Sequence, residues 1–468
     1  MKKPLFFLPF LPFGFNKWIG CIFLCCLFTY TSFSQNIAFK RANLLGKGMN
    51  ISWLEQYWQG SEQKKQMDYL DYSLLARRKN DLQRMSVGVK TVRLPICFDR
   101  WEDRIPPFTI DSMNYFKVID SMIQWTGELN MNLIIDYQHG NLRTQKIQQD
   151  TTRFFALWDQ IAQYFSNTDP DRIFLEPFNE PHNIDDALWW QIAEKVVKII
   201  RKHCPNHTIF LGGADYNNLS SLLRSKPIKD NNIIYTIHYY EPLIFTHQGT
   251  PWLGAPTSTI GIPFEADGGE EVLPTLAPGA KGTWGENKLY TYPEWKDTTT
   301  VHKDLKKAAI WRSLFNVPVY CGEFGSYRAG NVESRSKHLK RIRLALEQHK
   351  INYAWWEWDG NFSFMTNGKI PLIVQEAWGY KPAIPAPSLW KFNIKEINTG
   401  LFFEQSMTYA PGNIVLENMD NNKRFASYKI LNGKCTISKN GIPFELIKIS
   451  IWDADNRLRG THTWDRRK

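Results

Sequence analysis

The chain has 468 residues, which is enough for one large domain and a smaller one. Its composition, with 43% hydrophobic and 22% charged residues, is that of an ordinary globular protein. The formal net charge is +11, but the basic residues are spread along the chain without a long run or a nucleic-acid motif. We therefore expect a solvated basic surface and no nucleic-acid partner.

Residues 1–34 are predicted to be a secretory signal peptide. Three lysines precede the apolar run 18–33, which contains no charged residue, and Ser32 and Ser34 fit the positions before a cleavage site. An uncleaved membrane anchor is the alternative, but the run is short for a helix that spans a membrane. We expect export to the periplasm, the medium or the cell surface, without stable membrane insertion after cleavage.

Four cysteines remain after the predicted cleavage: Cys97, Cys204, Cys321 and Cys435. Their scattered spacing is neither a disulfide framework nor a zinc motif. The sequence leaves open whether Cys97 and Cys321 approach each other. We expect a protein that works without a metal or a cofactor.

Short apolar strands alternate with amphipathic helices along most of the chain. The expected strands are 46–53, 90–95, 131–136, 173–175, 208–212, 232–240, 317–320 and 353–357. The expected helices are 71–85, 111–127, 151–164, 185–203, 303–314 and 334–349. This alternation predicts an α/β fold, a (β/α)8 TIM barrel. A doubly wound open sheet is the alternative, but no glycine-rich phosphate loop follows the first strand.

Two glutamates lie in similar settings at the ends of predicted strands. Asn179 and Glu180 follow an apolar strand and are framed by Pro177 and Pro181, which prevent the strand from continuing. Glu323 follows a second apolar strand. A single motif of this kind is ordinarily a polar turn. In a barrel, however, the carboxyl ends of the strands converge on one mouth, so the two glutamates are expected to meet.

A pair of carboxyl groups suits glycoside hydrolysis. That reaction needs one protonated acid for the leaving group and one carboxylate to attack or to activate water. Burial and a neighbouring carboxylate raise the pKa of one member of such a pair. The 19 tryptophans agree with a sugar substrate, because sugar rings stack on aromatic faces, although most of them are expected to pack in the core.

Further polar and aromatic side chains are expected at the same mouth. They are Arg93, Gln138, His139, His238, Tyr240 and Trp356. Taken alone, His238 is more typical of a core histidine, Arg93 of a structural ion pair, and Trp356 of the core. Together with the two glutamates they predict one site.

Five motifs occur at strand ends in a fixed order: Val92-Arg-Leu-Pro95, Phe178-Asn-Glu-Pro181, Ile237-His-Tyr-Tyr240, Cys321-Gly-Glu-Phe-Gly325 and Ala354-Trp-Trp-Glu-Trp358. Each motif is weak alone, but the ordered set is specific. The set resembles glycoside hydrolase family 5, the cellulase-like group of retaining (β/α)8 glycosidases, over about residues 40–380.

The resemblance implies that Glu180 is the acid/base and Glu323 the nucleophile of a double-displacement mechanism, with the carboxyl groups roughly 5–5.5 Å apart. Asn179 would then hydrogen-bond the 2-hydroxyl of the sugar. Arg93 and Tyr240 would hold Glu323 ionised and oriented, because a cation and a hydroxyl donor both favour the charged form.

The resemblance also places His238 beside the acid/base and makes Trp356 the floor of the subsite that holds the cleaved sugar. One position departs from the family, which usually has the pattern Asp-x-His-His after the third strand. This chain has Asp136-Tyr-Gln138-His139, so that Gln138 replaces the first histidine and His139 matches the second. Glutamine can hydrogen-bond a sugar hydroxyl but cannot carry charge, so the change bears on substrate preference.

Residues 241–302 show little periodicity and are rich in glycine, proline and threonine. They carry Trp252, Trp284, Trp295 and an acidic group at 265–271. Long loops in compact domains are usually functional or disordered, so we expect a wall or lid that extends a sugar cleft. A decorative insertion is the alternative.

The domain boundaries follow from composition. We expect a catalytic domain at 35–380, a proline-rich linker at 381–387 and a small β-rich C-terminal module at 388–468. The module could bind carbohydrate, serve as a sorting signal or pack against the barrel.

The predicted function is that of a secreted retaining β-glycosidase acting on polysaccharide or oligosaccharide, foremost an endo-β-1,4-glucanase (a cellulase). A β-mannanase and an exo-β-glucosidase are the alternatives within the same chemistry. A non-catalytic glycan-binding protein is the alternative of another class, although binding alone has no need of both Glu180 and Glu323. The sequence does not indicate an oligomeric state.

Overall fold

The computed structural model describes the barrel region over residues 36–55, 72–103, 105–110, 112–264, 273–293, 299–365 and 368–380. In the C-terminal region it describes residues 392–397, 400–405, 412–419, 424–430, 434–438, 446–453 and 458–465. The predicted signal peptide and the predicted linker lie outside these residues. Within them, every helix is too short or too polar to cross a membrane.

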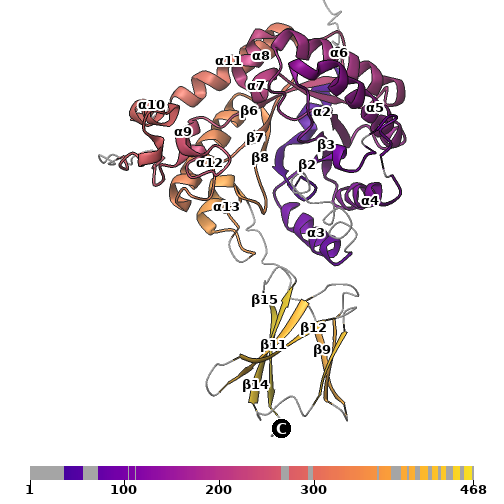
Figure 1. Ribbon diagram of the computed structural model, residues 1–468, viewed down its shortest axis with the longest axis vertical. Coiled ribbons are helices and arrows are strands. Elements are labelled where there is room, and N and C mark those ends of the chain that lie inside the picture. Colours follow the sequence, from indigo (N-terminus) through magenta and orange to yellow (C-terminus); the bar gives the residue numbers. More distant parts are fainter. Residues whose placement is uncertain are drawn as a thin grey trace, which may run out of the picture.

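Eight parallel strands close into a barrel in the order of the sequence (Figure 1). They are β1 (Lys47–Asn50), β2 (Thr91–Ile96), β3 (Asn132–Tyr137), β4 (Ile173–Glu176), β5 (Ile209–Gly212), β6 (Ile233–His238), β7 (Val319–Phe324) and β8 (Asn352–Trp355). The pairing of β1 with both β2 and β8 closes the barrel. The predicted (β/α)8 barrel is confirmed, and the doubly wound alternative is wrong.

All six predicted helices are present, with ends that differ from the prediction by at most four residues. They are α3 (Tyr72–Met85), α4 (Ser112–Glu128), α5 (Ile147–Phe165), α6 (Asp186–His203), α11 (Thr299–Phe315) and α12 (Val332–Gln348). The structure adds helices that no pattern predicted: α2 (Ile37–Leu45), α7 (Ala214–Asn217), α8 (Leu219–Arg224) and α13 (Leu372–Trp378).

Several strand ends differ from the prediction by a few residues, and two of these differences bear on the site. β7 runs on to Phe324, so that Glu323 lies inside the strand instead of following it. β8 ends at Trp355, so that Trp356 lies just beyond the strand and its backbone N–H donates to the carbonyl of Phe324 at 2.9 Å. Residues 353–358 are mostly aromatic and contain no glycine or proline to mark the end of a strand, which explains the misplaced boundary.

The interior of the barrel is layered. One layer of apolar side chains consists of Ile134, Phe174, Phe210, Ile234, Tyr320 and Ala354, and the apolar residues of α2 belong to the same cluster. Side chains on a strand alternate between its two faces, so the residues two positions later face the interior again. Those residues include Asp136, Glu176 and Thr236, which make the next layer polar. The functional side chains belong to this polar layer.

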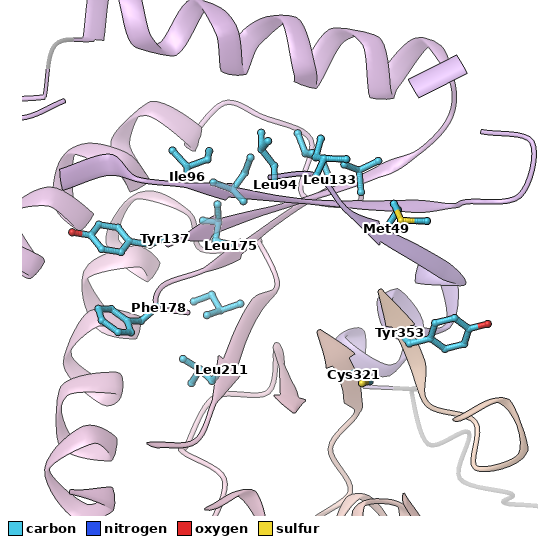
Figure 2. Close-up of a cluster of buried hydrophobic side chains, with 14 of the residues drawn as sticks. Met49, Leu94, Ile96, Leu133, Tyr137, Leu175, Phe178, Leu211, Cys321 and Tyr353 are labelled. Carbon is cyan, nitrogen blue, oxygen red and sulfur yellow. The ribbon is translucent and has the colours of Figure 1, made fainter. Parts of the chain in front are cut away.

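The outer faces of the strands pack against the surrounding helices and form the main hydrophobic core. Figure 2 shows part of it, including Leu94 of β2, Leu133 of β3 and Leu175 of β4. Each fully buried leucine stabilises the fold by about 1.5–3 kcal/mol relative to an exposed one. The polar layer therefore rests on a rigid support.

The insertion between β6 and α11 is more ordered than its composition predicts. It contains α9 (Leu243–Thr246) and α10 (Trp284–Thr291), and has an apolar cluster of its own: Ile244, Phe245, Ile262, Phe264, Leu289 and Tyr292. The carboxamide of Gln248 exchanges two hydrogen bonds with the backbone of Ile262. Trp295 and the acidic group at 265–271 lie outside the described residues.

The C-terminal region forms two antiparallel sheets, in agreement with the predicted β-rich segment. One has the order β13-β10-β9 and the other β12-β11-β14-β15. Their bounds are β9 (Phe392–Ile397), β10 (Gly400–Gln405), β11 (Gly412–Asn418), β12 (Arg424–Ile430), β13 (Lys434–Ser438), β14 (Leu446–Asp453) and β15 (Leu458–Asp465). Side chains from both sheets, such as Phe403 and Ile449, share one buried cluster, so the region is a small β-sandwich.

Candidate active site

Arg93 of β2 is the centre of the polar layer and is fully buried. Its guanidinium forms a bidentate pair with Glu176 at the end of β4, at 2.6 and 3.0 Å. Nη1 donates to Glu323 at 2.7 Å and to Asn50 at 3.0 Å, and Nη2 donates to Asn179 at 2.9 Å. The rigid fork of an arginine fixes several acceptors at once, so Arg93 sets the relative positions of these groups.

Glu323 accepts a hydrogen bond at each of its carboxyl oxygens. Oε1 accepts from Arg93, and Oε2 accepts from the hydroxyl of Tyr240 at 2.8 Å. Burial raises the pKa of Glu323, whereas His238, Arg93 and the Tyr240 hydroxyl act to lower it. The contacts of this side chain are therefore those that stabilise a carboxylate.

Glu180 follows β4 in a different setting. Its φ of 49° is left-handed, a conformation that non-glycine residues rarely adopt outside functional sites. Oε1 lies 2.6 Å from Nδ1 of His238, and 26% of the Glu180 side chain is exposed. Burial raises the pKa of Glu180 to about 7, although Arg93, His182 and His139 act to lower it. Glu180 can therefore hold a proton near neutral pH.

The structure brings the two glutamates together. One carboxyl oxygen of Glu180, one of Glu323 and a ring nitrogen of His238 all lie within 4.8 Å of one another. Paired carboxyl groups roughly 5–5.5 Å apart belong to double-displacement glycosidases, whereas single-displacement enzymes separate them by about 6.5–9.5 Å. The same three groups could also hold a metal ion, but the chemistry of a carboxyl pair at this separation requires none.

His238 ends β6 and is neutral at neutral pH, because burial lowers its pKa to about 4. Its Nδ1 faces Glu180 and also lies 3.6 Å from Glu323. Its Nε2 lies 3.4 Å from the carboxamide nitrogen of Asn217, which is fully buried. His238 thus links the two glutamates to a residue that the sequence did not single out.

Asp136 adds a third buried carboxyl group to the surroundings of Arg93. Its Oδ2 lies 3.2 Å from Nη2 of Arg93, and neither oxygen has a hydrogen-bond partner among the described residues. Burial raises the pKa of Asp136 well above its usual range. One guanidinium cannot neutralise Asp136, Glu176 and Glu323 together, so the geometry assigns the neutral, protonated form to Asp136.

The residues after β3 lie at the same mouth but face other partners. Gln138 is buried, and its backbone N–H donates to the carbonyl of Ile96 at 2.9 Å. His139 has a left-handed φ of 58°, and its Nε2 lies 2.6 Å from a carboxyl oxygen of Glu55. Of the glutamates Glu55, Glu180 and Glu323, Glu55 is therefore the one whose carboxyl group lies within hydrogen-bonding distance of His139.

Exposed aromatic rings lie near the two glutamates and connect to each of them through other side chains. Trp252 of the β6–α11 insertion is 54% exposed, and its ring packs against Tyr327 and Phe362. Phe362 in turn contacts Tyr240, the hydroxyl donor to Glu323. On the Glu180 side, Tyr216 is 53% exposed and stacks on His182 with centroids 4.8 Å apart.

Sequence reasoning missed several residues of this layer. Asp136 and Glu176 each lie two positions after an inward-facing apolar residue, so the two-residue alternation along β3 and β4 could have found them. Asn50 lies two positions after Gly48 of β1, where a glycine gives no apolar side chain to mark the inward face. Glu55 lies in an irregular segment, and Asn217 lies in the four-residue α7, which contains left-handed residues, so no periodicity points to either residue.

All four cysteines of the described region are buried, and none of them, Cys97 and Cys321 included, forms a disulfide bond there. Their sulfur atoms contact backbone carbonyls, that of Glu55 for Cys97 and that of Glu323 for Cys321.

Comparison with known proteins gives a consistent result. The family model for cellulase (glycosyl hydrolase family 5) matches residues 49–362. Endoglucanase 3 of Fibrobacter succinogenes is 29% identical over 367 residues, which cover 73% of this chain and 53% of that protein. Endoglucanase C of Acetivibrio thermocellus is 27% identical over 327 residues, covering 66% of this chain and 90% of that protein. This chain thus spans about half the length of the first relative.

Solved structures are similar over the same region. Two structures of Cel5A from Thermotoga maritima, one in complex with mannotriose and one with cellobiose, are 25% identical to this chain, with TM-scores of 0.59 and 0.58. Each match covers 73% of this chain and 99% of the other. The shared part is thus the barrel.

Proposed function

The chain belongs to glycosyl hydrolase family 5, and from this premise we propose that it is an exported retaining endo-β-1,4-glucanase. The observation that carries the proposal is the pair of carboxyl oxygens of Glu180 and Glu323 within 4.8 Å of each other, in unlike surroundings. Relatives named as endoglucanases support a β-glucan as substrate. The predicted signal peptide at 1–34 supports export.

The first step forms a covalent intermediate. The carboxylate of Glu323 attacks the anomeric carbon while the bond from that carbon to the leaving sugar's oxygen breaks, and Glu180 gives its proton to that oxygen. Arg93 and Tyr240 hold the attacking carboxylate in place. The products of this step are a glycosyl ester of Glu323, a released sugar chain and an ionised Glu180.

The second step reverses these roles. Glu180 takes a proton from a water molecule whose oxygen attacks the anomeric carbon, and the bond between that carbon and Glu323 breaks. Both carboxyl groups return to their starting state, and the anomeric configuration is retained. The carboxamide oxygen of Asn179 accepts from Arg93, so the NH2 group would donate to the sugar's 2-hydroxyl.

Sugar units on both sides of the cleaved bond fit the aromatic surface of the site. Tyr216 stacks on His182, two residues after Glu180, and Trp252 packs against Phe362, which contacts the Tyr240 that holds Glu323. Trp356, partly exposed just after β8, would carry the sugar that is cleaved. An aromatic face on each side supports endo action, because an exo-acting pocket is closed on one side.

The substrate preference rests on groups near β3. Gln138 would accept or donate one hydrogen bond to a sugar hydroxyl without a charge, and His139 would act with its partner Glu55. The catalytic unit would be residues 35–380, followed by a linker at 381–387 and a small β-rich module at 388–468, within which strands β9 to β15 form the β-sandwich.

The proposal is tested by reducing-sugar release from soluble β-glucans, mannan and xylan. Wild type is compared with Glu180→Gln and Glu323→Gln, which preserve size but remove the acid and the nucleophile. We expect wild type to cleave a β-1,4-glucan and both variants to lose at least about 10²-fold in activity, the lower range for general acid–base catalysis. Wild type that binds a glycan but cleaves none would establish a binding protein instead, and active variants would place the site elsewhere.

A further inference from the structure

We propose that Asn217 is a positioning residue for the reaction: it fixes which ring nitrogen of His238 carries the proton, and thereby directs the acid proton of Glu180 to the oxygen that meets the substrate. The inference rests on the proposed function, in which Glu180 is the acid/base. Its structural basis is a chain of contacts from Glu180 through His238 to Asn217.

Asn217 belongs to a strained turn at the end of β5. Asp215, Tyr216 and Asn217 have φ values of 60°, 60° and 54°, so three consecutive non-glycine residues are left-handed. A left-handed conformation is unfavourable for residues other than glycine, and asparagine tolerates it better than most. Strain of this kind persists where the surroundings impose it, and it points to a function.

The turn is tied to the site from two directions. The backbone N–H of Tyr216 donates at 3.2 Å to the carbonyl of Pro181, the residue after Glu180. Asn218, the residue after Asn217, forms a β-bridge with His238. The turn is thus fixed relative to both the acid/base and its histidine.

The side chain of Asn217 fits a space that a glycine leaves open. Asn217 is fully buried, and a Cβ added at Gly212 would lie 1.9 Å from its carboxamide oxygen. Any larger residue at position 212 would displace the carboxamide. The backbone of β5 thus holds the Asn217 side chain against His238.

The contact with Asn217 selects one form of the histidine ring. His238 is neutral, so only one of its nitrogens carries a proton. The carboxamide nitrogen of Asn217 is a donor only, and it lies 3.4 Å from Nε2, which must therefore accept. The proton of His238 then resides on Nδ1, because the hydrogen bond at one nitrogen sets the protonation of the other.

This form of His238 decides where Glu180 carries its proton. Nδ1–H donates to Oε1 of Glu180 at 2.6 Å, so Oε1 accepts a hydrogen bond and the acid proton belongs on Oε2. Oε2 has no hydrogen-bond partner within the described residues, and the side chain is 26% exposed. If the proton of His238 were on Nε2 instead, Nδ1 would have no proton and would accept a hydrogen bond from a protonated Oε1 of Glu180. The acid proton would then point toward the histidine and away from the leaving group.

The charged groups around His238 leave this assignment intact. Glu323 lies 3.6 Å from the same Nδ1 and, like Glu180, favours a donor at that position. Arg93 and Glu176 act on the ring only at longer range, with opposite signs. At Nε2, the contact that sets the protonation of the ring is the one with Asn217.

Two variants separate positioning from stability. Asn217→Asp preserves size and tolerates the left-handed turn, but its carboxylate only accepts and so requires a proton on Nε2. Asn217→Gly preserves the turn and removes the carboxamide. Asp215→Asn is the matched control, because Asp215 has the same left-handed conformation but is exposed.

The kinetic readout is kcat/KM for two aryl β-cellobiosides. Phenyl β-cellobioside has a poor leaving group and needs the acid proton, whereas the 2,4-dinitrophenyl compound needs none. For both Asn217 variants we expect a loss of about tenfold or more on the phenyl substrate, a part of the 10²–10⁴-fold that general acid catalysis supplies. On the dinitrophenyl substrate we expect less than about a twofold change, as for the control on both substrates.

A second readout does not depend on activity. Nitrogen-15 NMR of histidine-labelled protein, with His238 assigned by its substitution, reports which ring nitrogen is protonated. We expect the proton on Nδ1 in wild type and a proton on Nε2 in Asn217→Asp. A wild-type proton on Nε2, or equal changes on both substrates, would overturn the inference. If wild type cleaves neither substrate, the proposed function fails, and the NMR result still decides the role of Asn217.

Discussion

Glu180 and Glu323 flank the same histidine, but the fold supports them differently. Glu323 lies within β7, and its two oxygens accept from Arg93 and from Tyr240. Glu180 lies beyond β4 on a left-handed residue, and one of its oxygens meets the neutral ring of His238. In the first region each carboxyl oxygen of a strand residue accepts a hydrogen bond. In the second, a left-handed residue carries a carboxyl group of which one oxygen has no hydrogen-bond partner in the described part of the chain.

This difference explains how two glutamates in one site take two different roles. Burial raises the pKa of both glutamates, but only Glu323 has a guanidinium and a phenol in direct contact with its carboxyl group. Those contacts favour the ionised form, whereas a neutral imidazole is compatible with a protonated neighbour. The strand holds the group that must attack, and the turn holds the group that must exchange a proton.

The largest expected loss of activity comes from replacing each of the two glutamates by alanine. Azide is then added as an external nucleophile. Glu323→Ala should lose at least about 10⁴-fold on every aryl cellobioside, because no nucleophile remains. Glu180→Ala should lose about 10²–10⁴-fold on phenyl β-cellobioside but little on the dinitrophenyl compound.

The azide products distinguish the two variants further. Azide should yield the α-cellobiosyl azide with Glu323→Ala and the β-cellobiosyl azide with Glu180→Ala, both measured by NMR of the product. The reverse assignment of the two anomers would exchange the roles of the two glutamates.

A smaller loss of activity is expected from a substitution at Glu176, the residue that pairs with Arg93. Glu176→Gln removes the charge from a bidentate pair whose contacts are 2.6 and 3.0 Å long. Hydrogen bonds to charged groups are worth about 1.5–3 kcal/mol, so kcat/KM should fall about tenfold to hundredfold. The loss should be similar for both aryl substrates, because Arg93 acts through Glu323. A loss confined to the phenyl substrate would instead connect Glu176 with the acid/base.

The pH profile sharpens the comparison. The acid step needs protonated Glu180, whose pKa is about 7, so kcat/KM on phenyl β-cellobioside should fall as the pH rises through about 7. The dinitrophenyl substrate should lack this alkaline limb, because it does not need the proton. An alkaline limb of equal position for both substrates would assign it to another group.

The smallest effect on activity is expected from Asp136→Asn. Because the geometry makes Asp136 neutral, the variant should retain kcat/KM within about twofold, less than 1 kcal/mol. The raised pKa of Asp136 means that the folded state binds a proton that the unfolded state has lost, so the unfolding free energy falls as pH rises above about 4.

The Asp136→Asn substitution removes this pH dependence, because a carboxamide does not titrate. Thermal melts at pH 5 and pH 8 should therefore show that the variant has a Tm equal to or above that of wild type, with the larger difference at pH 8. A marked loss of stability at pH 8 would show that Asp136 is ionised in the folded protein.

The fold was predictable because its signals are local. Apolar runs such as Met131–Ile135 and the amphipathic face of α6 identify strands and helices without tertiary information. The end of β8 was misplaced by the aromatic run around Trp356, which continues past the last paired residue. Helix α2 was missed because it is short and directly precedes β1.

The site was predictable only in part. Glu180, Glu323 and Arg93 lie on or directly after strands, and the barrel alone brings them to one mouth. Asn217 was not predictable, because its left-handed φ and its burial depend on Gly212 and His238, which are neighbours in space. Local patterns therefore identified the groups at the mouth but not the groups that orient them.

The central claim is that Glu323 becomes covalently linked to the sugar. The most direct measurement is mass spectrometry of peptides from wild-type protein treated with 2,4-dinitrophenyl 2-deoxy-2-fluoro-β-cellobioside, whose fluorine slows release of the intermediate. The account predicts a fluorocellobiosyl group on the peptide that contains Glu323, and none on Glu323→Gln. A label on Glu180, or rapid cleavage of a β-glucan with inversion and without any label, would contradict it.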